Sequence, residues 1–183
     1  AKDTAIKSAF LKVNTREHLL LFYDDKGING GISGNEAIKI KFEIDTRPPA
    51  GASFEKKYRL LPTPYEVNMY DEPSLFAGKL HAVICRNWKN IVKGRDLYDY
   101  VFYMSRGAHV NLPHLRARLI DSGFITENDA CELEDVKKML MNKFNTIDYK
   151  QAIEDVIPFI KDSSKIDLWS ADFFQQITEN LME

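Results

Sequence analysis

Hydrophobic and charged residues alternate most regularly in the segment AIKIKFEID, residues 37–45. Side chains of an extended chain point alternately to opposite faces, so this period of two predicts a β-strand with one apolar and one charged face. The apolar face carries Ile38, Ile40, Phe42 and Ile44, and the charged face carries Lys39, Lys41, Glu43 and Asp45. Further strands are predicted in the apolar run HLLLFYDD at 18–25 and near 56–61 and 65–70.

Two other segments complete the N-terminal part. Residues 2–13 place Ile6, Phe10 and Val13 at helical spacing, which predicts a short helix. The segment GINGGISGN, residues 27–35, is rich in glycine. A phosphate-binding loop needs a helix directly after its glycines. Because a strand follows here, we interpret the glycine-rich segment as the connection of a hairpin.

The pattern changes near residue 73, after which apolar residues recur every three or four positions and predict helices. The predicted helices are 73–88, 95–105, 111–121, 127–144, 148–160 and 170–182. Strands followed by helices favour the α+β class, with a small mixed sheet followed by a helical C-terminal bundle. We expect a boundary near Gly107, between residues 1–107 and residues 108–183.

The composition limits the function further. The 183 residues carry a net charge of −2, so a nucleic-acid site would have to be a local patch. The two cysteines, Cys85 and Cys131, lie far apart and fit no metal motif, which indicates reduced thiols of a cytoplasmic protein. No stretch reaches the roughly 18 apolar residues of a membrane helix, so no membrane partner is expected.

A lysine interrupts the apolar face of the first predicted helix. Lys79 falls inside the apolar arc of residues 73–88, on one stripe with Glu72 and Arg86 at seven-residue spacing. A lysine on a core-facing surface must extend to solvent, form an ion pair or line a cavity. Two interpretations stay open. Lys79 either forms an ion pair with a carboxylate that fixes packing, or stands at the wall of a cleft and faces phosphate oxygens.

The next helix begins with two carboxylates, in the sequence GRDLYDYVFYM. Asp96 could be the N-cap of this helix, with Asp99 three residues later completing a capping box. Alternatively, the two carboxylates could hold Mg²⁺ or orient a hydroxyl nucleophile. Arg95 suits a phosphate or a neighbouring carboxylate equally well.

The charged face of the strand at 37–45 presents a second pair of carboxylates. Glu43 and Asp45 point the same way, about 7 Å apart by strand geometry. Alternation of this kind is common on a solvent-facing strand. Carboxylates on rigid backbone are also what metal-dependent nucleotidyl transfer requires.

The segments LFAGKLHAVICR and KGRDLYDYVFY, within residues 39–107, resemble the AbiEii/AbiGii family of nucleotidyltransferases, toxins of abortive-infection and toxin–antitoxin systems. The resemblance implies a nucleotidyltransferase-like sheet followed by a helical half. It also implies Mg²⁺-dependent transfer of a nucleotide from a nucleoside triphosphate to an RNA acceptor such as tRNA or to a protein acceptor, opposed by a cognate antitoxin protein. The residues and the resemblance together give these candidate roles: catalysis for Lys79 and Asp96; phosphate or nucleotide binding for Lys41, Lys79 and Arg95; metal binding for Glu43; supporting positions for Asp45, Asp99 and Arg86.

One motif of this family is not found. Its members carry a small-residue turn followed by a D-x-D-type pair on a strand, and nothing before residue 37 fits. Asp24 and Asp25 are adjacent, so on a strand they would point to opposite faces. We therefore expect a truncated, C-terminal portion of such a protein that is inactive on its own. The alternative is a non-catalytic module of the same fold that binds a nucleotide or a partner.

Overall fold

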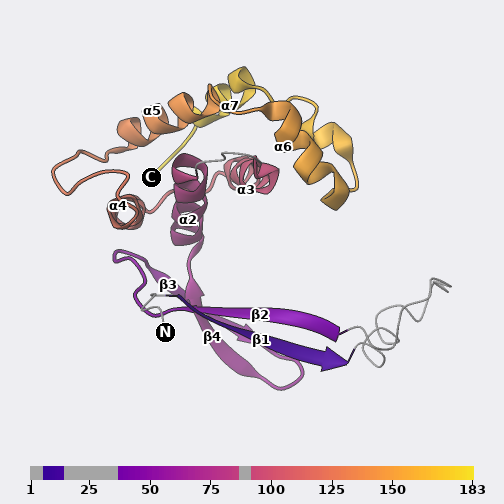
Figure 1. The fold of residues 1–183 in the computed structure, drawn as a ribbon. Coiled ribbons are helices and arrows are strands. Elements are labelled where there is room, and N and C mark those ends of the chain that lie inside the picture. Colours follow the sequence, from indigo (N-terminus) through magenta and orange to yellow (C-terminus); the bar gives the residue numbers. More distant parts are fainter. Residues whose placement is uncertain (1–5, 15–36, 87–91) are drawn as a thin grey trace. The chain divides into compact units, whose positions relative to one another are not determined.

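The computed structural model describes residues 6–14, 37–86 and 92–183, with side chains from residue 43 onward (Figure 1). The chain divides into two compact units, Ala1–Pro48 (unit 1) and Pro49–Glu183 (unit 2). The described residues of unit 1 include a pair of antiparallel strands, and unit 2 combines a β-hairpin with all the described helices.

Unit 1 pairs strand β1 (Ile6–Asn14) with strand β2 (Ala37–Asp45) in an antiparallel ladder. The strand predicted at 37–45 is confirmed with its exact bounds. The helix predicted over 2–13 is wrong, because β1 occupies most of that segment. An isolated helix of a dozen residues is marginal, whereas the regular strand β2 offers a partner for nine residues. The predicted strand at 18–25 and the glycine-rich connection lie outside the described residues.

Unit 2 begins with strands β3 (Phe54–Arg59) and β4 (Tyr65–Tyr70), also antiparallel. Phe54 and Tyr70 are directly opposite in the ladder, and their rings stack at 4.9 Å between centroids. Strands before helices confirm the α+β class. Both described strand pairs are antiparallel, so the mixed pairing expected for the sheet is not found within them.

The helices of unit 2 follow the predicted order with shifted bounds. They are α2 (Glu72–Cys85), α3 (Gly94–Ser105), α4 (Leu112–Asp121), α5 (Leu133–Phe144), α6 (Tyr149–Val156) and α7 (Ala171–Thr178), with 3₁₀ turns η1 (Ile157–Phe159) and η2 (Ser163–Ile166). The largest shift is in α5, predicted from residue 127. Glu132 and Asp135 form a reciprocal capping box that starts this helix at Leu133.

The core of unit 2 is formed where these helices meet. Helix α2 packs against α3, α4 and α5, while α3 packs against α6 and α5 against α7. Figure 1 shows α5, α7 and α6 in an arc beside α2 and α3. The largest fully buried side chains come from several helices: Phe76, Leu80, Leu97, Tyr100, Leu115, Leu119, Leu140, Phe144 and Phe174. Helices on both sides of Gly107 share this core, and a functional boundary there stays a prediction.

A polar network fixes the entry into α2. Asp71 caps the helix by accepting a hydrogen bond from the Ser74 backbone N–H at 3.0 Å. Asn111 donates to the Gly51 carbonyl and to the Ser74 hydroxyl, which ties the start of α4 to the start of α2. Gly51 has φ +81°, and a Cβ there would lie 3.0 Å from the His114 backbone nitrogen. The β3–β4 hairpin is thereby anchored to α2 and α4.

Candidate functional site

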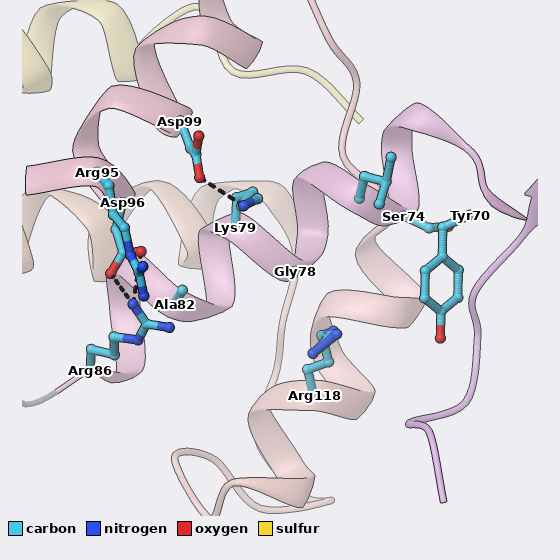
Figure 2. Close-up of a pocket in the computed structure, with 11 residues that line it drawn as sticks. Tyr70, Ser74, Gly78, Lys79, Ala82, Arg86, Arg95, Asp96, Asp99 and Arg118 are labelled. Atoms are coloured by element: carbon cyan, nitrogen blue, oxygen red, sulfur yellow. Dashed lines mark hydrogen bonds and ion pairs between the residues drawn. The ribbon is translucent and has the colours of Figure 1, made fainter. Parts of the chain in front are cut away.

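A cavity of about 380 Å³ opens between α2, α3 and α4 of unit 2 (Figure 2). Its lining combines several basic side chains, two carboxylates and small or apolar residues: Tyr70, Ser74, Leu75, Gly78, Lys79, Ala82, Arg86, Arg95, Asp96, Asp99 and Arg118. The cavity therefore gathers Lys79 and Asp96, the two predicted catalytic residues, together with Arg86, Arg95 and Asp99.

The α2 wall is made of small residues at helical spacing. Ser74, Gly78 and Ala82 recur every four residues and lie on one face, which continues to Arg86. Their short side chains leave the space that long basic side chains enter. A Cβ added at Gly78 would meet the Arg118 guanidinium at 3.5 Å.

Lys79 lies at one edge of the cavity and forms an ion pair. Its Nζ donates to Oδ2 of Asp99 at 2.7 Å, and the two side chains are 42% and 35% exposed. Such a half-exposed pair contributes little stability, about 0–1 kcal/mol. Both interpretations of Lys79 are thus met in part, because the lysine pairs with a carboxylate and also lines a cleft.

Arg86 and Asp96 form a tighter pair. The Nη1 of Arg86 donates to both oxygens of Asp96, at 2.8 and 2.6 Å (Figure 2). The Asp96 side chain is only 6% exposed, whereas that of Arg86 is 44% exposed. Charge-assisted bonds of this length are strong, and they fix the carboxylate in one orientation.

Asp96 is not the N-cap of α3, and that interpretation is wrong. The N-cap is Lys93, and Asp96 lies in the first turn. The helix begins earlier because Gly94 lets α3 approach α6 closely: a Cβ on Gly94 would lie 2.0 Å from the Ala152 carbonyl oxygen. The backbone N–H of Gly94 donates to Asp155 at 3.0 Å, which supplies the capping interaction from another helix.

Arg118 completes the cavity and was missed by the sequence reasoning. Its Nε donates to Nε2 of His114 at 3.2 Å. His114 is fully buried, and its Nδ1 lies 2.8 Å from the Ala50 carbonyl oxygen. His114 thus lies between the Ala50 carbonyl and the Arg118 guanidinium, and its contact with Nε of Arg118 orients that side chain. The signal in the sequence was the small-residue face of α2, which makes room for a long side chain from a neighbour.

The cavity has a surplus of positive charge. Four cations, from Lys79, Arg86, Arg95 and Arg118, face two carboxylates, which leaves two positive charges in excess. Among the described residues, Arg95 and Arg118 form no ion pair with a carboxylate. Such cations gain most from an anionic partner.

The remaining candidate residues belong to unit 1. In the β1–β2 ladder, Lys41 lies opposite Phe10 and Glu43 opposite Ser8. Asp45 accepts a hydrogen bond from the Arg47 backbone N–H at 3.0 Å, where the strand ends. The parts of Lys41, Glu43 and Asp45 in the site stay predictions.

Among the described residues, no group of three or more His, Cys, Asp or Glu side chains is placed to hold a metal ion. None of the helices in the described ranges has the length and apolar character to cross a membrane.

Comparison with known proteins identifies the family. Residues 3–177 match a family model described as "Nucleotidyl transferase AbiEii toxin, Type IV TA system". This match extends well beyond the 39–107 stretch in which the resemblance was seen. Neither the curated proteins nor the solved structures give a match. Because the matched region covers nearly all of its length, the chain belongs to the AbiEii family of nucleotidyl transferase toxins of type IV toxin–antitoxin systems.

Proposed function

We propose that the cavity between α2, α3 and α4 binds the phosphates of a nucleoside triphosphate, whose nucleotide is transferred to an RNA or protein acceptor. The observation that carries this proposal is the surplus of two positive charges among its lining residues. A triphosphate is a compact polyanion, and basic side chains in a partly enclosed site form charge-assisted hydrogen bonds with its oxygens. Arg95 and Arg118 would contact the phosphates without first giving up a carboxylate.

In this proposal Lys79 and Asp96 have complementary roles. Lys79 exchanges its exposed partner Asp99 for a phosphate oxygen and stabilises charge that develops on phosphorus. Asp96 takes the proton of the acceptor hydroxyl after Arg86 has turned towards the phosphates. The acceptor oxygen then bonds to the α-phosphorus as the bond to pyrophosphate breaks.

Mg²⁺ is implied by the family, but the described residues of unit 2 do not fit a metal site as they stand. Asp96 and Asp99 are both bound to cations, and Mg²⁺ prefers oxygen ligands free of such partners. Glu43 and Asp45 of β2, with Lys41 beside them for phosphate, are proposed to supply further groups.

The same ion pairs favour a second candidate function, a nucleotide- or partner-binding module without catalysis. Asp96 and Asp99 would then serve to hold Arg86 and Lys79 in place. In either case we propose a cognate antitoxin as partner and the cytoplasm, where nucleoside triphosphates and RNA occur, as the location.

Titration calorimetry with sodium tripolyphosphate tests phosphate binding directly. We expect Arg118→Ala and Lys79→Ala each to weaken binding by about tenfold or more, in line with about 1.5–3 kcal/mol for a charged hydrogen bond. Two controls are matched in charge and element type. Arg116→Ala changes an arginine of α4 that lines none of the described cavities, and Lys138→Ala changes a 72% exposed lysine of α5.

Equal loss in the cavity variants and in their controls would contradict the proposal. It would show that binding follows the net charge of the chain and not the cavity. Binding that decreases more steeply with added salt in the intact chain than in the cavity variants supports the site further.

A further inference from the structure

A second cavity, of about 450 Å³, adjoins the phosphate cavity on the other side of α3. It lies between α3 and the end of α6 with η1, and it is lined by Lys93, Arg95, Tyr98, Asp99, Asp155, Val156, Phe159 and Ile160. Arg95 and Asp99, one turn apart on α3, line both cavities. The volume is within the range of small-molecule sites.

The walls of this second cavity differ from those of the first. Four of its lining residues are aromatic or aliphatic, and the charged ones stand at the start of α3 and on α6. Phe159 is 85% exposed, the highest exposure among the large hydrophobic residues described. Because its ring is little covered by the protein and lines the cavity, Phe159 offers an open aromatic face to a flat ligand.

The cavity is held open by bonds that do not depend on Phe159. The backbone N–H of Val92 donates to Gln151 at 2.7 Å, and that of Gly94 donates to Asp155 at 3.0 Å. These bonds connect the start of α3 to α6, and η1 follows α6 directly. The junction of α3 and α6 beside this cavity is therefore fixed independently of Phe159.

We propose that the second cavity binds the base of the nucleotide whose phosphates occupy the first, with Phe159 as the ring on which the base stacks. The inference rests on the proposed function, because it assigns the other half of the same ligand. A nucleotide joins a polyanion to a flat aromatic ring, and the two adjoining cavities offer cations in one and an aromatic wall in the other. Stacking on an aromatic side chain accepts any base, since every base has a π face.

The test compares ligands with and without a base. Calorimetry on the full chain, without divalent cations, measures binding of tripolyphosphate, ATP, GTP, CTP and UTP. We expect at least one nucleotide to bind about tenfold more tightly than tripolyphosphate. Phe159→Ala should remove this difference and leave tripolyphosphate binding unchanged, whereas Phe159→Trp should keep it. Phe124→Ala is the matched control, because Phe124 is 48% exposed and lines none of the described cavities.

Other outcomes separate this inference from the proposed function. Equal affinity for tripolyphosphate and all four nucleotides overturns the base site and leaves the phosphate site standing. No binding of either kind of ligand overturns both. The inference also fails if Phe159→Ala spares nucleotide binding and has another effect. Weaker binding of a short single-stranded RNA would assign the cavity to an acceptor. A lower mass in light scattering would assign it to contact with a second copy of the chain.

Discussion

At the scale of single residues, the sequence located most of the cavity but not the pairing inside it. Lys79, Arg86, Arg95, Asp96 and Asp99 were all marked from residue type and spacing, and the structure brings them to one cavity. The ion pairs depend on how α2 and α3 pack, and a local sequence pattern does not predict that packing. Arg118 was missed for the same reason, because it enters from a helix distant in sequence.

Removing a carboxylate from the cavity should strengthen anion binding. Asp99→Asn releases Lys79 from its 2.7 Å ion pair and raises the surplus of positive charge. Because exposed pairs are worth about 0–1 kcal/mol, we expect tripolyphosphate to bind more tightly, by up to about fivefold. Titration calorimetry measures the change, with Asp167→Asn, at an exposed position outside the lining residues, as the control. Weaker binding in Asp99→Asn would mean that the carboxylate is needed to position Lys79.

A second residue-scale prediction concerns His81, whose Nε2 is buried with no hydrogen-bond partner among the described residues. Burial, and then the nearby positive charge of Arg118, lower the pKa of His81 below its usual 6.5. Above that pH the ring is neutral in both folded and unfolded chains. As the pH falls below it, the unfolded chain takes up a proton that the folded chain resists, so stability is lost.

Thermal unfolding between pH 7.5 and pH 5.5 checks this sign. We expect the Tm of the intact chain to fall over this range, and His81→Leu to reduce the fall. His109→Leu, which changes an exposed histidine, is the control. The same slope in the intact chain and in His81→Leu would show that His81 titrates normally.

At the scale of elements, secondary structure was predicted correctly where the local sequence pattern and the tertiary contacts favour the same element. The alternation in β2 gave its exact bounds, and the caps at Asp71 and Asn111 mark the starts of α2 and α4. The helix predicted over 2–13 failed because the spacing of Ile6, Phe10 and Val13 fits a helix, whereas their β-branched and aromatic types suit a strand. Pairing with β2, more than twenty residues away in sequence, decided between them.

Two glycines in helices should respond oppositely to the same substitution. Gly94→Ala places a methyl group 2.0 Å from the Ala152 carbonyl oxygen and 2.6 Å from Val156, so α3 and α6 must separate. We expect a loss of about 3 kcal/mol or more in the free energy of unfolding. Gly78→Ala meets only the Arg118 side chain, at 3.5 Å, and should gain up to about 1 kcal/mol from helix propensity.

Urea denaturation of both variants measures these changes. Each variant is the control for the other, because both add one methyl group to a helical glycine. Similar destabilisation in both variants would mean that helix α2 needs Gly78 for a reason other than space. An unchanged free energy of unfolding in Gly94→Ala would show that the contact between α3 and α6 relaxes at little cost.

At the scale of the whole molecule, the family match supports catalysis, whereas the cavity offers fewer free carboxylates than metal-dependent transfer needs. The match covers residues 3–177, which supports the nucleotidyl transferase class for the chain as a whole. Transfer by two metal ions needs about three carboxylates free to bind them. The two in the cavity are bound to Lys79 and Arg86, and no D-x-D-type pair is present before residue 37. Binding and transfer are therefore expected to separate in this chain.

Incubation of the 183-residue chain with α-labelled nucleoside triphosphates, Mg²⁺ and bulk tRNA should transfer no label above background, although the same preparation binds tripolyphosphate. The cations of the cavity suffice to hold phosphate, because charge-assisted hydrogen bonds need no metal. Transfer needs a nucleophile activated and aligned at phosphorus, and carboxylates occupied by arginine and lysine provide neither role until they are released. Repeating the assay with EDTA shows whether any signal depends on a divalent cation. The prediction would be contradicted by label transfer that disappears in Glu43→Gln. Glu134→Gln, at an exposed position on α5, is the control and should then keep the transfer. This result would make β2 part of a working active site.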